Sequence, residues 1–297
     1  MSVTYDHRPL KNPSPELVAF KEGITEYEKA GMNGPPPWSI GAPLPPMPEN
    51  VEIIRFAANG LDCIKTTVGM KSRKAVYFIH GGGFMAGDVE DSLLLLPEIT
   101  ARSGIDGYSL QYTLVPEARY PTQIEQCVAM YQWLLEQGYD QIAVTGVSAG
   151  ANLSLAVAMR CREMGLPMPA CVACMSAALD STGTVKPKRR DFLSADVDGL
   201  VTKNYAGDAD LFTPEISALF ADFNNFCPTL LQAGAWESLH DAHLALIERV
   251  EREGVDTPVL FSLWEGLGHG FALEGGYYPE GYVGREQVID YILAHFG

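Results

Sequence analysis

The sequence predicts an α/β fold in which a mostly parallel sheet is flanked by helices. Strand-like and helix-like segments alternate from residue 75 to residue 296, and such alternation is typical of parallel strands joined by crossover helices. A glycine string follows one apolar strand-like run, and a serine between glycines separates another strand from a helix. Both features are expected at the carboxyl ends of parallel strands, where open α/β sheets bind their ligands.

The N-terminal residues differ in composition from the rest of the chain. A helix-like run at 15–30 is followed by two proline-rich stretches, 34–38 and 43–48. Proline ends a helix and stiffens the connection that follows it. We therefore expect residues 1–48 to form an N-terminal cap segment outside a main α/β domain that spans residues 49–297.

The main domain is expected to contain an eight-stranded sheet. It opens with an antiparallel pair, 51–57 and 61–68, joined at Asn59-Gly60, a dipeptide that favours a tight hairpin turn. The next elements are predicted as strand 75–80, helix 90–103, strand 105–112, helix 121–137, strand 141–147, helix 149–163 and strand 170–177. A loop-rich insertion at 179–225 should contribute to the cap. The alternation resumes with strand 229–233, helix 238–253, strand 258–264 and helix 285–296.

Composition limits the partners and the location. The formal net charge of −16 opposes binding to nucleic acid and to anionic membranes. The chain has no apolar stretch long enough to span a bilayer, and its first 21 residues lack the apolar core of a signal peptide. A cytoplasmic location is expected, and a homodimer is compatible with the sequence. The basic run at 186–190 is interpreted as a solvated loop.

No cofactor or metal is expected. The six cysteines are dispersed through predicted strands and helices, where free cysteine often packs as a small apolar side chain. Cys171 and Cys174 form a C-x-x-C pair, but they lie in an apolar strand-like run without a second ligand pair nearby. This setting favours core packing over a metal or redox role.

The candidate nucleophile is Ser148. It lies in Gly146-Val147-Ser148-Ala149-Gly150, with an apolar β-forming run before it and a good helix sequence after it. A G-x-S-x-G string of this kind forms a sharp strand-to-helix turn in which the glycines let the backbone crowd the serine. Without that setting, an ordinary tight turn would be the simpler interpretation.

The second glycine string is His80-Gly81-Gly82-Gly83. It directly follows 75–79, an apolar run typical of a strand that is buried on both faces. Glycine leaves backbone N–H groups uncovered, and such groups can stabilise the charge that develops on a carbonyl oxygen during acyl transfer. The string therefore predicts an oxyanion hole.

A serine hydroxyl needs a histidine to take its proton, and the histidine needs an acid. His269 lies in a glycine-rich loop after the last long strand, where a mobile, exposed imidazole is expected. His240 and His243 are interpreted as helix-surface residues. Glu237 is preferred as the acid because it lies at a strand end, whereas Asp241 in the following helix is the alternative.

Several strings resemble the hormone-sensitive-lipase family of α/β-hydrolases, the bacterial-type carboxylesterases. Residues 112–117 (YTLVPE) with Tyr120-Pro121 resemble the Y-x-L-A-P-E and F-P of the family, and 266–271 (GLGHGF) resembles its G-M-x-H-G-F. The resemblance implies an α/β-hydrolase fold with Ser148 as nucleophile and His269 as general base. It also implies that His80 orients the glycine loop and that the oxyanion hole is formed by the backbone N–H groups of Gly82, Gly83 and Ala149.

The sequence departs from the family pattern at three places. The family often has G-D-S-A-G-G-N around the serine, whereas Val147 and Ala151 replace the aspartate and the later glycine here. The acid of the family is commonly aspartate, and Glu237 has a longer reach. The family's S-P-W-x-D-L after the next strand is replaced by Ser-Ala-Ala-Leu-Asp at 176–180.

These residues predict a cofactor-independent serine hydrolase that cleaves a small-molecule carboxylic ester through an acyl-enzyme. A lactonase, amidase or thioesterase would use the same groups. A ligand-binding protein on the same fold is the alternative from another class, although plant gibberellin receptors, which resemble this family, lack the histidine that is present here. Short to medium acyl chains are expected, with a pocket lined by Trp38, Phe84, Met85, Leu239 and Phe271.

Overall fold

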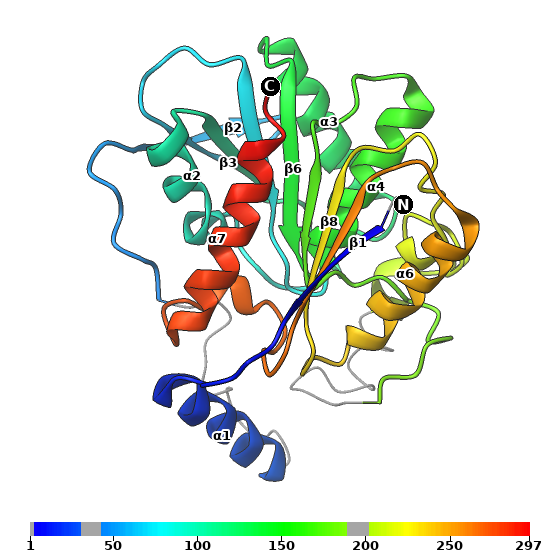
Figure 1. The fold of residues 1–297 in the computed structure, drawn as a ribbon. Helices are drawn as coiled ribbons and strands as arrows, with labels where there is room; N and C mark the ends of the chain where they lie inside the picture. Colours follow the sequence, from blue (N-terminus) through cyan, green and yellow to red (C-terminus); the bar gives the residue numbers. More distant parts are fainter. Residues whose placement is uncertain (1–2, 31–42, 189–201) are drawn as a thin grey trace.

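A computed structural model describes residues 3–30, 43–188 and 202–297, and its central feature is a nine-stranded sheet (Figure 1). The strand order is β1-β9-β8-β7-β6-β4-β5-β3-β2. The strands are β1 (Val3–Arg8), β2 (Glu52–Ala58), β3 (Leu61–Thr67), β4 (Lys74–Ile79), β5 (Asp106–Leu110), β6 (Gln141–Val147), β7 (Val172–Met175), β8 (Thr229–Gly234) and β9 (Val259–Trp264). Only the pairs that involve β3 are antiparallel, so the predicted mostly parallel sheet is confirmed.

Helices cover both faces of the sheet. The helices whose bounds are established are α1 (Pro15–Lys29), α2 (Leu96–Ser103), α3 (Thr122–Glu136), α4 (Ala149–Met164), α6 (His240–Glu253) and α7 (Pro279–Ala294), with short 3₁₀ turns η1 (Val89–Leu94), η2 (Ala218–Phe220) and η3 (Phe271–Leu273). In Figure 1, α2 and α7 lie on one side of the sheet, and α3, α4 and α6 lie on the other. The result is the three-layer arrangement expected from alternating strands and helices.

The buried strands supply side chains to two separate cores. In β4, Ala75, Tyr77 and Ile79 belong to the core under α3, α4 and α6. Val76 and Phe78 belong to the core under α2 and α7. Successive side chains of a strand point to opposite faces, so a continuous apolar run is what a doubly covered strand requires.

The expected eight strands were one too few, because the N-terminal segment contributes β1. This strand pairs in parallel with β9 from Val3↔Val259 to Arg8↔Trp264 and forms one edge of the sheet. Most of its side chains are exposed or half-buried, as expected for an edge strand. Part of the segment expected as a cap therefore belongs to the catalytic sheet.

The predicted hairpin is confirmed. β2 and β3 pair antiparallel up to Ala58↔Leu61, and Asn59 and Gly60 have φ angles of 52° and 78°. A two-residue turn with positive φ at both positions matches the twist of the flanking strands. The turn therefore uses a residue pair that tolerates the left-handed region.

The last helix begins earlier than expected. α7 starts at Pro279 rather than near residue 285, and it contains Gly281 and Gly284. A Cβ atom on Gly284 would lie 2.3 Å from the Phe271 ring, so this glycine lets the helix approach η3 closely. The two glycines reduce helix propensity, but the Pro at the first helical position is favourable for a helix start.

The cysteines pack as predicted. All six are buried and free of disulfides, and burial raises the pKa of Cys171 to about 12. A thiol with so high a pKa is not a thiolate near neutral pH, so it is a poor nucleophile and metal ligand. Among the residues that the structure describes, no helix is both long enough and apolar enough to span a membrane.

Candidate active site

Residues from four strand ends meet at the carboxyl edge of the parallel sheet. β4 lies between β5 and β6 in the sheet. The next strand along the chain, β5, is added on one side of β4, and β6 is added on the other side, so the strand order reverses at β4 and creates a topological switch point. The glycine string follows β4, Ser148 follows β6, and Glu237 and His269 follow β8 and β9. The predicted site residues are therefore brought to one edge, as expected.

Ser148 occupies a strained turn between β6 and α4. Its φ and ψ angles are 57° and −120°, a conformation that non-glycine residues rarely adopt. Its N–H donates to the carbonyl oxygen of Met175 at 2.9 Å, which ties the turn to the end of β7. The turn has the geometry of a nucleophile elbow, with its side chain at the top of the sheet.

Two glycines make this turn sterically possible. A Cβ atom on Gly146 would lie 2.5 Å from the carbonyl oxygen of Gly150. A Cβ atom on Gly150 would lie 2.1 Å from the carbonyl oxygen of Ile79 and 2.3 Å from that of His80. These distances are too short for real contacts, so only glycine lets the start of α4 pack against the end of β4.

We expect Gly150→Ala to lower the free energy of unfolding by about 1–3 kcal/mol, because the new methyl group collides with backbone rather than with a mobile side chain. The measurement is urea denaturation. Gly23→Ala is the matched control, since nothing lies within 4 Å of its Cβ position and α1 should tolerate or favour alanine. Equal stability of Gly150→Ala and the parent protein would contradict the close approach.

The glycine loop after β4 is held by buried aromatic and imidazole rings. Gly82 has a φ of 98°, and a Cβ atom there would lie 2.2 Å from the carbonyl oxygen of Ala86. The His80 ring stacks on Tyr112 with centroids 4.1 Å apart, and the Tyr112 hydroxyl lies 3.2 Å from the carbonyl oxygens of His80 and Gly81. These contacts support the expected role of His80 in orienting the loop.

His80 is a neutral imidazole in the folded protein. It is fully buried, its Nδ1 lies 2.9 Å from the carbonyl oxygen of Gly81, and burial lowers its pKa from 6.5 to about 4. The unfolded chain therefore binds a proton at this residue between pH 6.5 and 4, and the folded protein does not. Protonation of the unfolded chain at His80 therefore lowers the free energy of unfolding as the pH falls from 6.5 to 4. Above pH 6.5 the residue is neutral in both states, and this loss of stability is absent.

We expect the free energy of unfolding to fall by about 2 kcal/mol between pH 7 and pH 5 on account of this residue alone. Urea denaturation at both pH values measures the total change. In His80→Gln the pH dependence should be smaller by that amount, because the amide does not titrate. An unchanged pH dependence in the variant would show that His80 is not the buried neutral base inferred here.

Glu237 and His269 are brought together by the loops after β8 and β9. Glu237 Oε2 lies 3.5 Å from His269 Nδ1, and the carboxylate is fully buried. His269 is 8% exposed, so the expected exposed imidazole is wrong. The backbone N–H of Trp236 donates to the carbonyl oxygen of Leu267 at 2.9 Å and so joins the Glu237 segment to the His269 loop. This close packing of the two loops agrees with the burial of the His269 side chain.

His243 is not a helix-surface residue, which corrects the sequence interpretation. Its side chain is fully buried, and its Nδ1 lies 3.9 Å from Glu237 Oε1. The Ala177 N–H donates to Nε2 at 3.2 Å, and Nδ1 lies 2.9 Å from the carbonyl oxygen of Leu239. Burial lowers the pKa of His243, although the nearby Glu237 opposes the shift, so the ring is neutral and carries its proton on Nδ1.

Asp241, the alternative acid, faces the insertion. Its Oδ2 accepts a hydrogen bond from the Lys188 N–H at 2.7 Å, and its Oδ1 lies 3.6 Å from Lys188 Nζ. It lies in the first turn of α6, where a negative charge is favoured by the helix dipole. Lys186 and Lys188 are exposed, as expected for the basic run, whose last two residues lie outside the described residues.

The residues expected to line the pocket fall into three groups. Trp38 lies outside the described residues. Phe84 and Phe271 are 4% and 1% exposed, and they fill the two cores on either side of the sheet. Met85 is 37% exposed and Leu239 is half-buried, so these two present apolar surface beside the glycine loop and the acid.

An aromatic contact that the sequence did not reveal supports the glycine loop. Tyr205 stacks on Phe84 with ring centroids 3.6 Å apart and an interplanar angle of 5°. Phe84 has a positive φ of 61°, and its carbonyl oxygen accepts a hydrogen bond from the Val115 N–H. The insertion residue Tyr205 therefore packs against the residue that follows Gly83.

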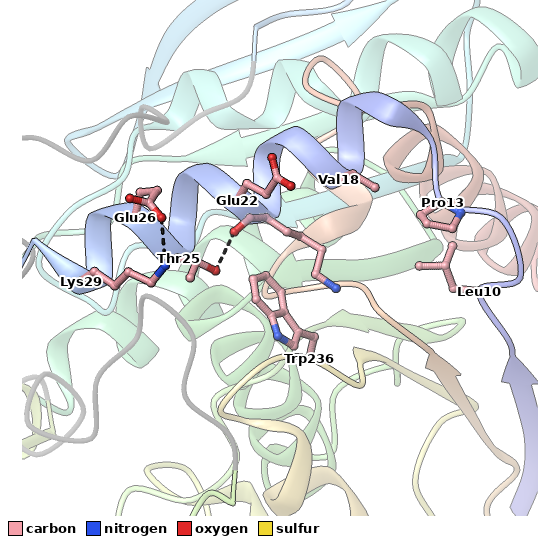
Figure 2. Close-up of a pocket in the computed structure, with 9 residues that line it drawn as sticks. Leu10, Pro13, Val18, Glu22, Thr25, Glu26, Lys29 and Trp236 are labelled. Carbon is pink, nitrogen blue, oxygen red and sulfur yellow. Dashed lines mark hydrogen bonds and ion pairs between the residues drawn. The ribbon is translucent and has the colours of Figure 1, made fainter.

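Helix α1 lies beside Trp236 (Figure 2). Lys21 Nζ donates to the carbonyl oxygen of Gly266 at 3.0 Å and lies 4.3 Å from the centroid of the Trp236 ring. Trp236 directly precedes Glu237, and Gly266 begins the loop that leads to His269. A pocket lies between α1 and Trp236, lined by Leu10, Pro13, Val18, Lys21, Glu22, Thr25, Glu26, Lys29 and Trp236.

The described residues do not suggest a metal site. In 3–30, 43–188 and 202–297, no three His, Cys, Asp or Glu side chains are grouped so that they could hold a metal ion.

The carboxyl edge of the sheet brings together a serine on an elbow, a glycine loop, and a histidine beside a buried carboxylate. This arrangement on the strand ends is typical of an α/β-hydrolase site.

Comparison with known proteins agrees with this geometry. The family described as alpha/beta hydrolase fold matches residues 76–273. An esterase of Acinetobacter venetianus is 32% identical over 213 residues, which cover 69% of this chain and 70% of that protein. An acetyl-hydrolase of Streptomyces hygroscopicus is 31% identical over 216 residues, 70% of this chain and 71% of that one.

Solved structures extend the similarity over almost the whole chain. A hormone-sensitive lipase from a metagenome library is 25% identical, with a TM-score of 0.82 over 97% of this chain and all of that chain. The chain belongs to the α/β-hydrolase family. Within it, the chain is a carboxylesterase of the hormone-sensitive-lipase type.

Proposed function

We propose that the chain hydrolyses carboxylic esters of short to medium acyl length with Ser148, His269 and Glu237 as its catalytic triad. The observation that carries the proposal is the pair of Glu237 Oε2 and His269 Nδ1, 3.5 Å apart at the strand edge where Ser148 occupies its elbow. The buried carboxylate fixes the proton on Nδ1, which leaves Nε2 of His269 as the base.

The reaction proceeds in two displacements. Ser148 Oγ attacks the ester carbonyl while His269 Nε2 takes the hydroxyl proton, and the N–H groups of Gly82, Gly83 and Ala149 stabilise the oxyanion. The intermediate collapses when His269 returns the proton to the leaving alcohol. Water then attacks the acyl-enzyme with His269 as base, and the acid leaves as Ser148 recovers its proton.

Two features support a preference for shorter acyl groups. Phe84 and Phe271 pack in the cores, so among the described residues Met85 and Leu239 are the predicted pocket residues that remain available at the site. The similar Streptomyces protein is by name an acetyl-hydrolase. We also propose that α1 of the N-terminal segment and the insertion 179–225 cover the site, which the contacts of Lys21 and Tyr205 support.

A panel of p-nitrophenyl esters from acetate to palmitate tests the proposal. We expect kcat/KM to be highest for short to medium chains and to fall by about tenfold or more for the longest, since a limited apolar surface cannot bury them. A lactone, an anilide and a thioester of the best acyl group measure the alternatives. A flat response across chain length, or faster turnover of one of these three substrates, would contradict the proposal.

A further inference from the structure

Ser176 has an unusual backbone conformation where β7 ends. Its φ is +49°, in the left-handed region that favours glycine, and the residue is 1% exposed. A side chain in this conformation is strained, and it persists only where the surrounding contacts determine it. Glycine would adopt this conformation without strain, but it has no side chain that could form a hydrogen bond at this position.

The hydroxyl of Ser176 is tied to the loop that carries His269. The Gly270 N–H donates to Ser176 Oγ at 2.9 Å, and Gly270 directly follows His269. The Ser176 N–H in turn donates to the carbonyl oxygen of Gln232 in β8 at 2.7 Å. Ser176 is therefore bound to the sheet through its backbone N–H and to the base loop through its hydroxyl.

The residues around Ser176 also reach the nucleophile and the helix after the acid. The Met175 carbonyl oxygen accepts the Ser148 N–H at 2.9 Å, and the Ala178 N–H donates to the Ser148 carbonyl oxygen at 3.2 Å. The Ala177 N–H donates to Nε2 of the buried His243. One short segment, 175–178, thus contacts the nucleophile turn, the base loop and the start of α6.

The His269 loop needs such an anchor because of its own sequence. Gly266 and Gly270 have positive φ angles of 72° and 70°, and Gly268 lies between them. Glycine has the greatest backbone freedom, so this loop is easily displaced unless its N–H groups are bound. A displacement of about 1 Å at a catalytic group can cost about 100-fold in rate.

We propose that Ser176 is a positioning residue for His269: its buried hydroxyl holds the Gly270 N–H, and thereby sets the place of the imidazole relative to Ser148 and Glu237. The inference rests on the proposed triad. Ser176 itself contacts neither the substrate nor the reacting atoms. Its backbone strain is retained because the hydroxyl must point at the base loop from this position.

Two substitutions separate positioning from a merely structural role. Both Ser176→Gly and Ser176→Ala remove the hydroxyl, but only glycine relieves the left-handed strain. We expect kcat for a p-nitrophenyl ester to fall about 10- to 100-fold in both variants, with KM changed by less than about threefold. The melting temperature of Ser176→Gly should be higher than that of Ser176→Ala.

Ser92→Ala is the matched control. Ser92 is also a fully buried serine, and its Oγ donates to the carbonyl oxygen of Val89 at 2.7 Å, away from the base loop. This variant should lose stability while keeping the parent kcat. The positioning role is wrong if kcat follows the melting temperature in all three variants. In that case Ser176→Gly, which relieves the backbone strain, would be as active as the parent.

The parent protein and Ser148→Ala are assayed beside these variants. Hydrolysis by the parent and its loss in Ser148→Ala establish the serine mechanism independently of Ser176. An inactive parent, or an active Ser148→Ala, would overturn the proposed function itself. An active, Ser148-dependent parent with full activity in Ser176→Gly would overturn only the role of Ser176.

Discussion

Ser148→Ala should lower kcat/KM for a short-chain p-nitrophenyl ester by at least about 10⁴-fold, because no other group on the site replaces the attacking oxygen. The variant should fold like the parent, since the strained turn depends on its glycines and on the hydrogen bond from the Ser148 N–H to Met175 rather than on the hydroxyl. Initial rates over a range of substrate concentrations, with a melting curve for each protein, are the measurements.

The melting curves decide how a loss of activity is understood. An inactive variant with the parent melting temperature supports Ser148 as the nucleophile. Activity within about tenfold of the parent, in a preparation shown by mass spectrometry to contain no parent protein, would rule it out.

Glu237→Gln is expected to lower kcat by about 10³- to 10⁴-fold with a smaller change in KM. The amide keeps the shape of the side chain, but it can no longer hold the Nδ1 proton of His269 or stabilise the imidazolium that forms. The fully buried position of Glu237, 3.5 Å from His269 Nδ1, makes this effect large.

Asp241→Asn is the matched control for the acid. Asp241 contacts the Lys188 backbone and side chain rather than His269, so its loss should change kcat by less than about tenfold while lowering stability. The reverse order of effects, with Asp241→Asn the more damaging variant, would assign the acid to Asp241. Near-parent activity in both variants would mean that neither carboxylate serves the histidine.

Three buried histidines of the site differ in their surroundings. His80 and His243 are fully enclosed, burial lowers the pKa of each, and their ring nitrogens contact backbone groups. His269 is paired with a buried carboxylate. His243 Nδ1 also lies 3.9 Å from Glu237, but both of its ring nitrogens contact backbone groups, so in the proposed mechanism His269 is the base and the other two histidines are neutral elements of the scaffold.

Much of the fold follows from local sequence. β6 and α4 on either side of Ser148 have nearly the expected bounds, because an apolar β-forming run and an alanine-rich helix leave little choice. The turn at Asn59-Gly60 was equally well determined, since few residue pairs accept its positive φ angles. The parallel direction of the strands in the centre of the sheet follows from their alternation with helices.

The misses have identifiable physical causes. β1 carries few apolar residues and pairs with a strand more than 250 positions later, so no local pattern reveals it. His243 could have been found, because it shares the spacing of the buried helix face with Leu246, Ile247 and Val250. Pro279 was likewise a usable start signal for α7.

The contact of Ser176 with Gly270 is of another kind. It joins residues 94 positions apart, and it depends on a left-handed backbone that serine does not favour. No local propensity predicts such a conformation. Positions of this kind, where local preference is overruled by the site, are where sequence reasoning is expected to fail.

Covalent labelling with a fluorophosphonate tests the central claim most directly, because the reagent requires an activated serine beside an oxyanion hole. Intact mass and peptide mapping of the folded protein report the site and extent of labelling. We predict one adduct per chain, located on Ser148, with ester hydrolysis lost in proportion to labelling. A folded protein that hydrolyses esters without labelling, or that is labelled at another residue, would contradict the account.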